Sequence, residues 1–197
     1  MAGTLSAAVR MPGWTFALAL DAVAAVGGYA IVRWGPPEAV GLALTAAAVL
    51  IATATASLSD DAVVDLTCTS PLTLRRRTIA RLSLGLLVAA AAGAAVFAGL
   101  IGTVPREALG DPVSSMILVV ALGTATGVAA ARIRPDIPAA IPAAVLLVGG
   151  ELCVQQLPLP AGGVVFDDSW TRTAGAVVLA AAVVAVMTRD RAAARPW

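Results

Sequence analysis

Six stretches almost free of charged residues dominate this sequence and leave few folds open to it. A helix crosses the hydrocarbon core of a bilayer in about 20 apolar residues. Hydrophobic residues make up 59% of the chain and charged residues 13%, against about 25% charged residues in soluble domains. The sequence therefore predicts an all-α integral membrane protein. The six expected spans are residues 13–32, 38–58, 78–102, 114–131, 138–157 and 170–188.

The connections between these spans are short and contain helix breakers. They include Gly35-Pro36-Pro37, Asp111-Pro112 and Arg134-Pro135. No long polar segment remains for a soluble domain, so residues 1–197 are expected to form a single six-helix transmembrane domain. The first apolar stretch follows a lone Arg10 and has no clean small-residue cleavage site. We expect it to be a permanent span rather than a signal peptide.

The distribution of arginine predicts the orientation in the membrane. If the N-terminus is cytoplasmic, ten arginines lie in cytoplasmic segments and three in external ones, Arg33, Arg106 and Arg172. Positive residues concentrate in cytoplasmic loops. Both termini, and the polar segment between the second and third spans, are therefore expected in the cytoplasm.

Several kinds of chemistry are excluded by residues that the chain lacks. It has no His, which removes Ser-His-Asp and Cys-His catalytic sets, and no Lys, which removes a Walker A nucleotide site. Cys68 and Cys153, one in a polar loop and one in an apolar stretch, do not indicate a disulfide framework or a zinc site. A net charge of +1 does not favour nucleic acid. We therefore expect no enzyme activity, no metal and no bound cofactor in this chain alone.

Two acidic residues fall inside predicted spans. Asp21 lies well within the first, and Glu151 lies in the fifth between two glycines and Gln155. Charges at such depth cost several kcal/mol unless they are paired or hydrated, so they are candidate functional residues. Asp21, Glu151 and Gln155 could line a polar substrate pathway, bind a cation or relay protons. The alternative is that each acid is protonated, or hydrogen-bonded to a neighbouring helix, and only orients packing.

Small residues are placed where helices can approach closely. Residues 123–127 form a GxxxG pattern, and Gly85, Ala89 and Gly93 recur along one stripe of the third span. Such patterns serve either as an interface between copies or as packing within one bundle. We favour packing within the bundle.

The polar segment between the second and third spans predicts a structured insert. Ser59 is a plausible N-cap for a short helix over residues 60–67, with acids in its first turn and an apolar face beyond. Such a helix would lie at the membrane surface and offer a rigid contact to a cytoplasmic protein. The residues expected to make that contact are Asp60, Asp61, Val63, Val64, Asp65 and Leu66.

A second helix start is predicted after this insert. Ser70 can cap a helix that has Pro71 at its first position. Positive-inside anchoring explains much of the basic run that comes next, but it does not explain the preceding helix. The expected cytoplasmic anchors are Arg75, Arg76, Arg77 and Arg81.

The stretch LTCTSPLTLRRR at residues 66–77 resembles the corresponding loop in permease subunits of type 2 ABC exporters. In that family a coupling helix lies between helices two and three, and a separate ATPase subunit acts on it. The family often has a Glu and a Gly upstream, where this chain has Asp60, Asp61 and Asp65 without the Gly. The resemblance implies ABC ATPase subunits that carry ATP and Mg, docked on the loop over residues 59–77. It also implies a second copy or a related permease as partner, surrounding membrane lipids, and a multi-pass position in a bacterial plasma membrane.

Two other functions remain open at this level. The chain could be the substrate-binding membrane subunit of an energy-coupling-factor vitamin importer, a class of similar length that presents a small-residue stripe on its first helix. It could also be an anchor or assembly subunit of a membrane complex without a transport role.

Overall fold

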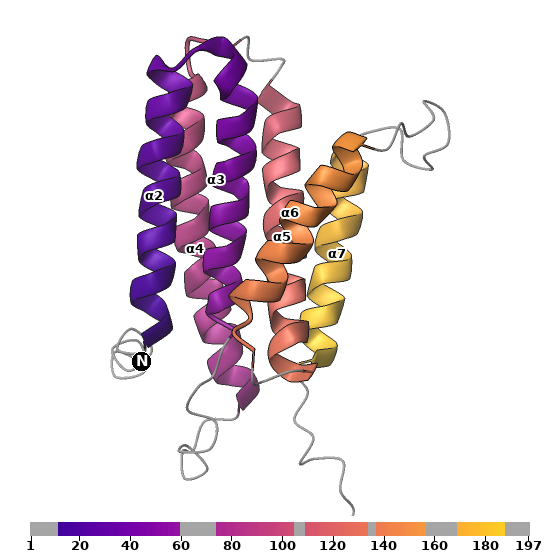
Figure 1. The fold of residues 1–197 in the computed structure, drawn as a ribbon. Coiled ribbons are helices and arrows are strands. Elements are labelled where there is room, and N and C mark those ends of the chain that lie inside the picture. Colours follow the sequence, from indigo (N-terminus) through magenta and orange to yellow (C-terminus); the bar gives the residue numbers. More distant parts are fainter. Residues whose placement is uncertain (1–11, 60–73, 105–108, 134–136, 157–168, 188–197) are drawn as a thin grey trace, which may run out of the picture.

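The computed structural model describes residues 12–59, 74–104, 109–133, 137–156 and 169–187, and these residues form six helices and no strand (Figure 1). Each helix overlaps one predicted span, so the predicted all-α fold is confirmed. The helices are α2 (Pro12–Trp34), α3 (Pro37–Ser57), α4 (Leu74–Leu100), α5 (Gly110–Ile133), α6 (Ala140–Gln156) and α7 (Ser169–Met187).

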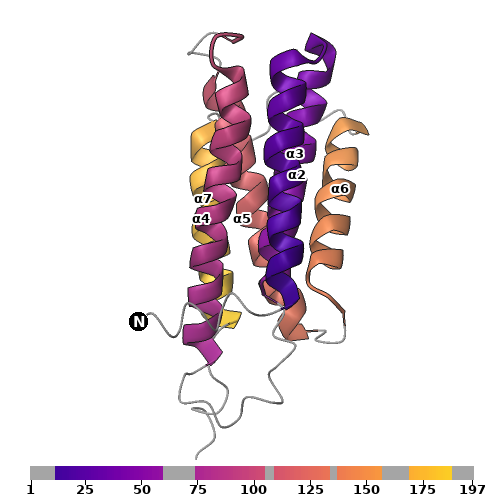
Figure 2. The same ribbon diagram turned by 90° about the vertical axis from the view of Figure 1, so that its left-hand side faces the viewer.

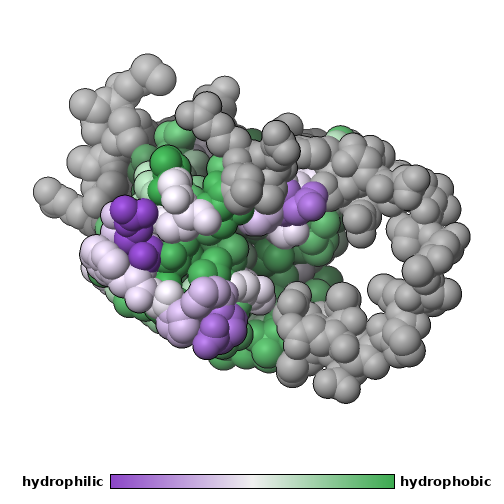
Figure 3. Space-filling model, turned by 90° about the horizontal axis from the view of Figure 1, so that it is seen from above, coloured by the Kyte–Doolittle hydropathy of each residue, from purple (hydrophilic) through white to green (hydrophobic). Residues whose placement is uncertain are grey.

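Four of these helices are long and apolar enough to cross a membrane. The qualifying stretches are Trp14–Trp34, Pro37–Ser57, Ile79–Leu100 and Gly110–Ile133; α6 and α7 contribute the shorter apolar stretches Ala140–Gly149 and Thr173–Met187. Large hydrophobic side chains are exposed on every helix. Viewed from the end where α2 joins α3, hydrophilic patches interrupt an otherwise largely hydrophobic surface (Figure 3). These features identify a membrane-embedded helical protein.

The chain reverses direction between α2 and α3 within two residues. The Gly35 amide donates to the Ile31 carbonyl at 2.8 Å and ends α2, while Pro36 is extended (φ −68°, ψ 146°). Pro37 then opens α3, where the missing proline N–H costs nothing because the first turn has no intrahelical acceptor. The two helices therefore lie antiparallel and packed side by side (Figures 1 and 2).

Helix α3 is the central element of the bundle. It packs against α2, α4, α5 and α6, whereas α7 packs against α5. Its second half is buried almost continuously, from Ile51 to Ser57 with Thr53 half-buried. A helix buried on all sides must be apolar all round, and this half is built from alanine, isoleucine and hydroxyl residues that bond their own backbone. Thr55 Oγ1, for example, donates to the Ile51 carbonyl at 2.9 Å.

The GxxxG pattern of α5 makes the contact with α3. A Cβ atom added to Gly123 would lie 2.7 Å from the Ala52 Cβ, and one added to Gly127 would lie 2.7 Å from the Ala56 Cβ. Glycine alone allows this approach of the two backbones. The pattern is therefore used within the chain, as we favoured, and Gly123 and Gly127 are both buried there.

Two hydrogen bonds join α5 to α7, one near each end of the pair. Thr173 Oγ1 donates to the Ser114 carbonyl at 3.1 Å, and Arg132 Nε donates to the Met187 carbonyl at 2.6 Å. The start of α7 thus meets the start of α5, and the end meets the end. The two helices run parallel, with α6 returning between them in the sequence (Figure 1).

We expect Gly127→Ala to destabilise the bundle by about 1–3 kcal/mol, because the new methyl group overlaps Ala56. The matched control is Gly175→Ala in α7, where an added Cβ meets no atom within 4 Å. That change should leave stability unchanged or raise it by up to about 1 kcal/mol through helix propensity. Unfolding by sodium dodecyl sulfate in mixed micelles, followed by circular dichroism, measures both. Equal stability of the two variants would contradict the α3–α5 contact.

Candidate functional site

One face of α2 is buried along its whole length. Its buried positions recur at intervals of three and four residues, which places them on one stripe of the helix. This stripe packs on α3 and α4. Its members are Trp14, Ala17, Asp21, Ala24, Gly28 and Val32.

Asp21 interrupts the hydrophobic core between two clusters. Ala17, one turn before it, belongs to a cluster with Trp14, Ala54 and Leu58. Ala24, one turn after it, belongs to the larger cluster that contains Ile51. The carboxyl therefore lies where α2, α3 and α4 meet, and only 6% of the residue is exposed.

One oxygen of the Asp21 carboxyl has no hydrogen-bond partner among the described residues. This Oδ1 atom is buried and accepts no hydrogen bond from the residues that the structure describes. A buried polar atom left unpaired costs about 1–3 kcal/mol, and a charged one costs more. Residues that persist against such a cost mark functional candidates inside membrane segments.

Other buried polar groups gather at the end of the bundle where α2 begins and α3 ends. Trp14 Nε1 and Ser59 Oγ are buried without a hydrogen-bond partner among the described residues. Arg81, a predicted cytoplasmic anchor, is also buried near the start of α4, with 6% exposed. Ser59 is the last described residue before the predicted coupling loop in the sequence.

Of the remaining predicted site residues, some lie in helices of the structure and others lie outside the described residues. Asp60, Asp61, Val63, Val64, Asp65 and Leu66, together with the predicted short helix over residues 60–67, lie outside the described residues. Arg75, Arg76 and Arg77 fall in the first turn of α4, which begins at Leu74. Glu151 and Gln155 fall in the last two turns of α6, one helical turn apart and so on the same face.

The two predicted intramembrane acids belong to helices that share α3 as a neighbour. Asp21 belongs to α2, which packs chiefly on α3 and α4, whereas Glu151 belongs to α6, which packs on α3 and α5. Among the described residues, no three His, Cys, Asp or Glu side chains are grouped as metal ligands. Asp21 is therefore the one predicted polar pathway residue whose surroundings are defined.

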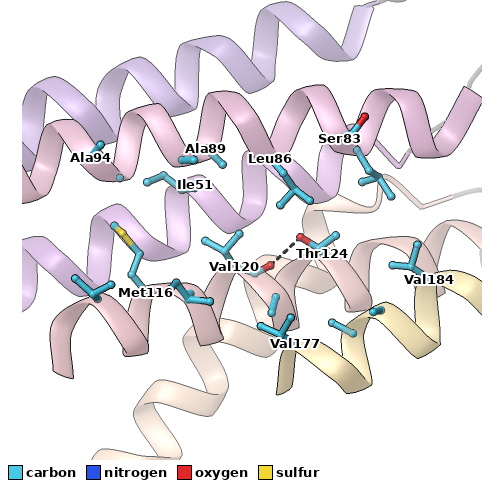
Figure 4. A pocket seen from close by; sticks show the side chains of 18 of the residues that line it. Ile51, Ser83, Leu86, Ala89, Ala94, Met116, Val120, Thr124, Val177 and Val184 are labelled. Carbon is cyan, nitrogen blue, oxygen red and sulfur yellow. Dashed lines mark hydrogen bonds between the residues drawn. The ribbon is translucent and has the colours of Figure 1, made fainter. Parts of the chain in front are cut away.

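A groove that sequence reasoning did not identify lies between α4 and the α5–α7 pair. Its volume is about 660 Å³, and Ile51 of α3 contributes to its wall. Leu86 of α4 and Thr124 of α5 enter it from opposite sides (Figure 4). The lining is apolar apart from Ser83 and Thr124, whose hydroxyls donate to carbonyls of their own helices. The stripe containing Ala89 and Gly93 was the sequence signal for it, since both line the groove.

Comparisons with protein-family models, with curated proteins and with solved structures find no match to this chain.

We expect Asp21→Asn to stabilise the isolated protein at neutral pH by about 1–3 kcal/mol, because a buried amide costs less than a buried carboxylate. The control is Glu38→Gln at the exposed first turn of α3, which should change stability by less than about 1 kcal/mol and in the opposite sense. Thermal unfolding in one detergent compares the variants. A destabilised Asp21→Asn protein would show that the carboxylate has a partner in the folded chain.

Proposed function

We propose that the chain is the membrane-spanning permease subunit of an ATP-driven exporter, energised by a separate ATPase that docks on the loop over residues 59–77. The observation that carries the proposal is the sequence of this loop: an acid-capped segment, Ser70-Pro71, and three arginines that open the next span. In this proposal the chain has no nucleotide site of its own, and ATP and Mg are bound by the partner.

The position of α3 supports this role for the loop. The loop follows α3 directly, and α3 packs against four of the other five helices. A force applied at residues 60–66 therefore acts on the end of the helix that most of the bundle touches. The buried polar end around Trp14 and Ser59 lies at the same place, and unpaired polar groups pack less firmly than a fully apolar core.

The pathway in this proposal includes Asp21. Its buried carboxyl would favour amphipathic substrates with a positive charge, because a cation would supply the missing partner. Glu151 and Gln155 would contribute from α6, which lies on another side of α3. We place the protein in a bacterial plasma membrane as six spans with both termini in the cytoplasm, paired with a second copy or a related permease.

The importer alternative has less support from α2. Small residues of this helix, including Ala17, Ala24 and Gly28, are buried against the bundle. The exposed side carries large side chains such as Phe16, Val23 and Val26, which suit lipid better than a closely packed partner helix.

The orientation can be tested with the native cysteine of the loop. In a Cys153→Ser protein, Cys68 should react with a membrane-impermeant maleimide only after the cells are permeabilised. In a protein without native cysteines, Gly162→Cys, in the connection predicted to be external, should react in intact cells. Labelling of Cys68 in intact cells would contradict the proposed topology.

The ATPase partner can be tested by affinity purification from native membranes. We expect a P-loop ATPase to co-purify in stoichiometric amounts, and replacement of residues 60–66 by a Gly-Ser linker of equal length to remove it. An equal-length replacement of residues 159–165 in the predicted external connection should retain it. Active transport by the purified chain without any ATPase would refute the proposal.

A further inference from the structure

The groove between α4 and the α5–α7 pair opens to the surroundings of the bundle. Helix α4 packs on α2 and α3, and α7 packs on α5, so none of the helices that the structure describes closes the space between α4 and α7. Lining residues on both sides are substantially exposed, including Ile79, Leu86, Ile117 and Val177. In a membrane this opening faces the acyl chains of the bilayer.

The length of the groove matches the apolar thickness of a membrane. Its lining on α4 runs from Ile79 to Phe97, which is about 27 Å of helical rise. The hydrocarbon core is about 30 Å thick. The tails of one phospholipid span one leaflet, which is half of this thickness, so they would extend from one end of the groove to about its middle.

The volume of the groove can be compared with the volumes of a helix and of an alkyl chain. A helix about 10 Å across and about 27 Å long fills roughly 2,100 Å³, which is about three times the 660 Å³ available. A single alkyl chain is about 4 Å across, the contact distance between carbon atoms, and fills roughly 350 Å³ over the same length. The groove therefore has room for the two tails of one phospholipid, whereas a helix of a second copy would lie along its open side rather than inside it.

Three arginines come just before the groove in the sequence of α4. Arg75, Arg76 and Arg77 occupy the first turn of α4, just before Ile79. Arg132 stands at the same end of the bundle, where it holds the end of α7. Each arginine near a membrane surface attracts anionic lipid by about 1 kcal/mol. The chemistry at this end is complementary to a phosphate headgroup.

We propose that this groove is a binding site for one anionic phospholipid, with its tails between α4 and the α5–α7 pair and its headgroup at the arginines that open α4. The site does not depend on an ATPase partner or on the direction of transport. It differs from the general lipid shell because its lining is concave and formed by four helices, so that a chain inside it contacts protein on more than one side.

The test is photo-crosslinking in nanodiscs that contain the full chain and a phosphatidylglycerol with a diazirine in its tail. We expect cross-linked peptides from α4, α5 and α7 to predominate. Ala90→Phe, which fills the groove, should lower their labelling by about fivefold, the equivalent of about 1 kcal/mol. The matched control is Ala91→Phe: Ala91 is also exposed on α4 but does not line the groove, so labelling should stay unchanged.

A second variant distinguishes filling of the groove from misfolding of the Ala90→Phe protein. Ala181→Phe fills the groove from α7 and should give the same loss while helicity is retained. A diazirine phosphatidylcholine should label the groove peptides less than phosphatidylglycerol, and replacing Arg75, Arg76 and Arg77 by Gln should remove that difference. Equal labelling of all exposed helices, cross-links between two copies through the groove, or displacement of the phospholipid by an equimolar free fatty acid would each overturn the proposal.

Discussion

Lipid tails are as apolar as leucine, so the helices of this chain gain little free energy by burying hydrophobic surface against one another. Their association depends instead on how closely the backbones approach. The glycines of α5 bring that helix against Ala52 and Ala56, and Gly28 of α2 would place a Cβ only 2.9 Å from Val96 of α4. Because α3 takes part in most of these contacts, its position determines where the other helices can lie.

The same close packing raises the free-energy cost of burying Asp21. The small residues that surround it leave a low-polarity core, in which an unpaired carboxyl oxygen is costly. A leucine-rich core could have separated the helices and admitted water to the acid. Here the nearest buried positions of the α2 stripe are Ala17 before Asp21 and Ala24 after it, so the acid is held against its neighbours.

Apolar runs and breakers predicted six helices, and each one exists with its bounds shifted by a few residues. The largest shifts are at the starts of α4 and α5, which begin at Leu74 and Gly110 rather than near residues 78 and 114. At α4 the helix continues through the basic headgroup region, where the apolar signal stops. Depth in a span also singled out Asp21. Its place between two clusters could not be predicted, since that requires knowing which helices meet. The small-residue stripe of α4 indicated part of the lining of the groove. Its location could not be predicted, because it depends on the described parts of α4 and α7 packing on different helices.

The two hydrogen bonds that join α5 and α7 have a mechanical consequence. Ser114 and Arg132 are separated by about 27 Å of α5. Helices α5 and α7 are therefore hydrogen-bonded to each other near both of their ends. Tilting one of these helices relative to the other breaks at least one bond, whereas moving both together breaks neither. A change in the width of the space beside α4 that comes from the α7 side therefore displaces α5 and α7 together, and a molecule bound in that space resists the displacement along its full length.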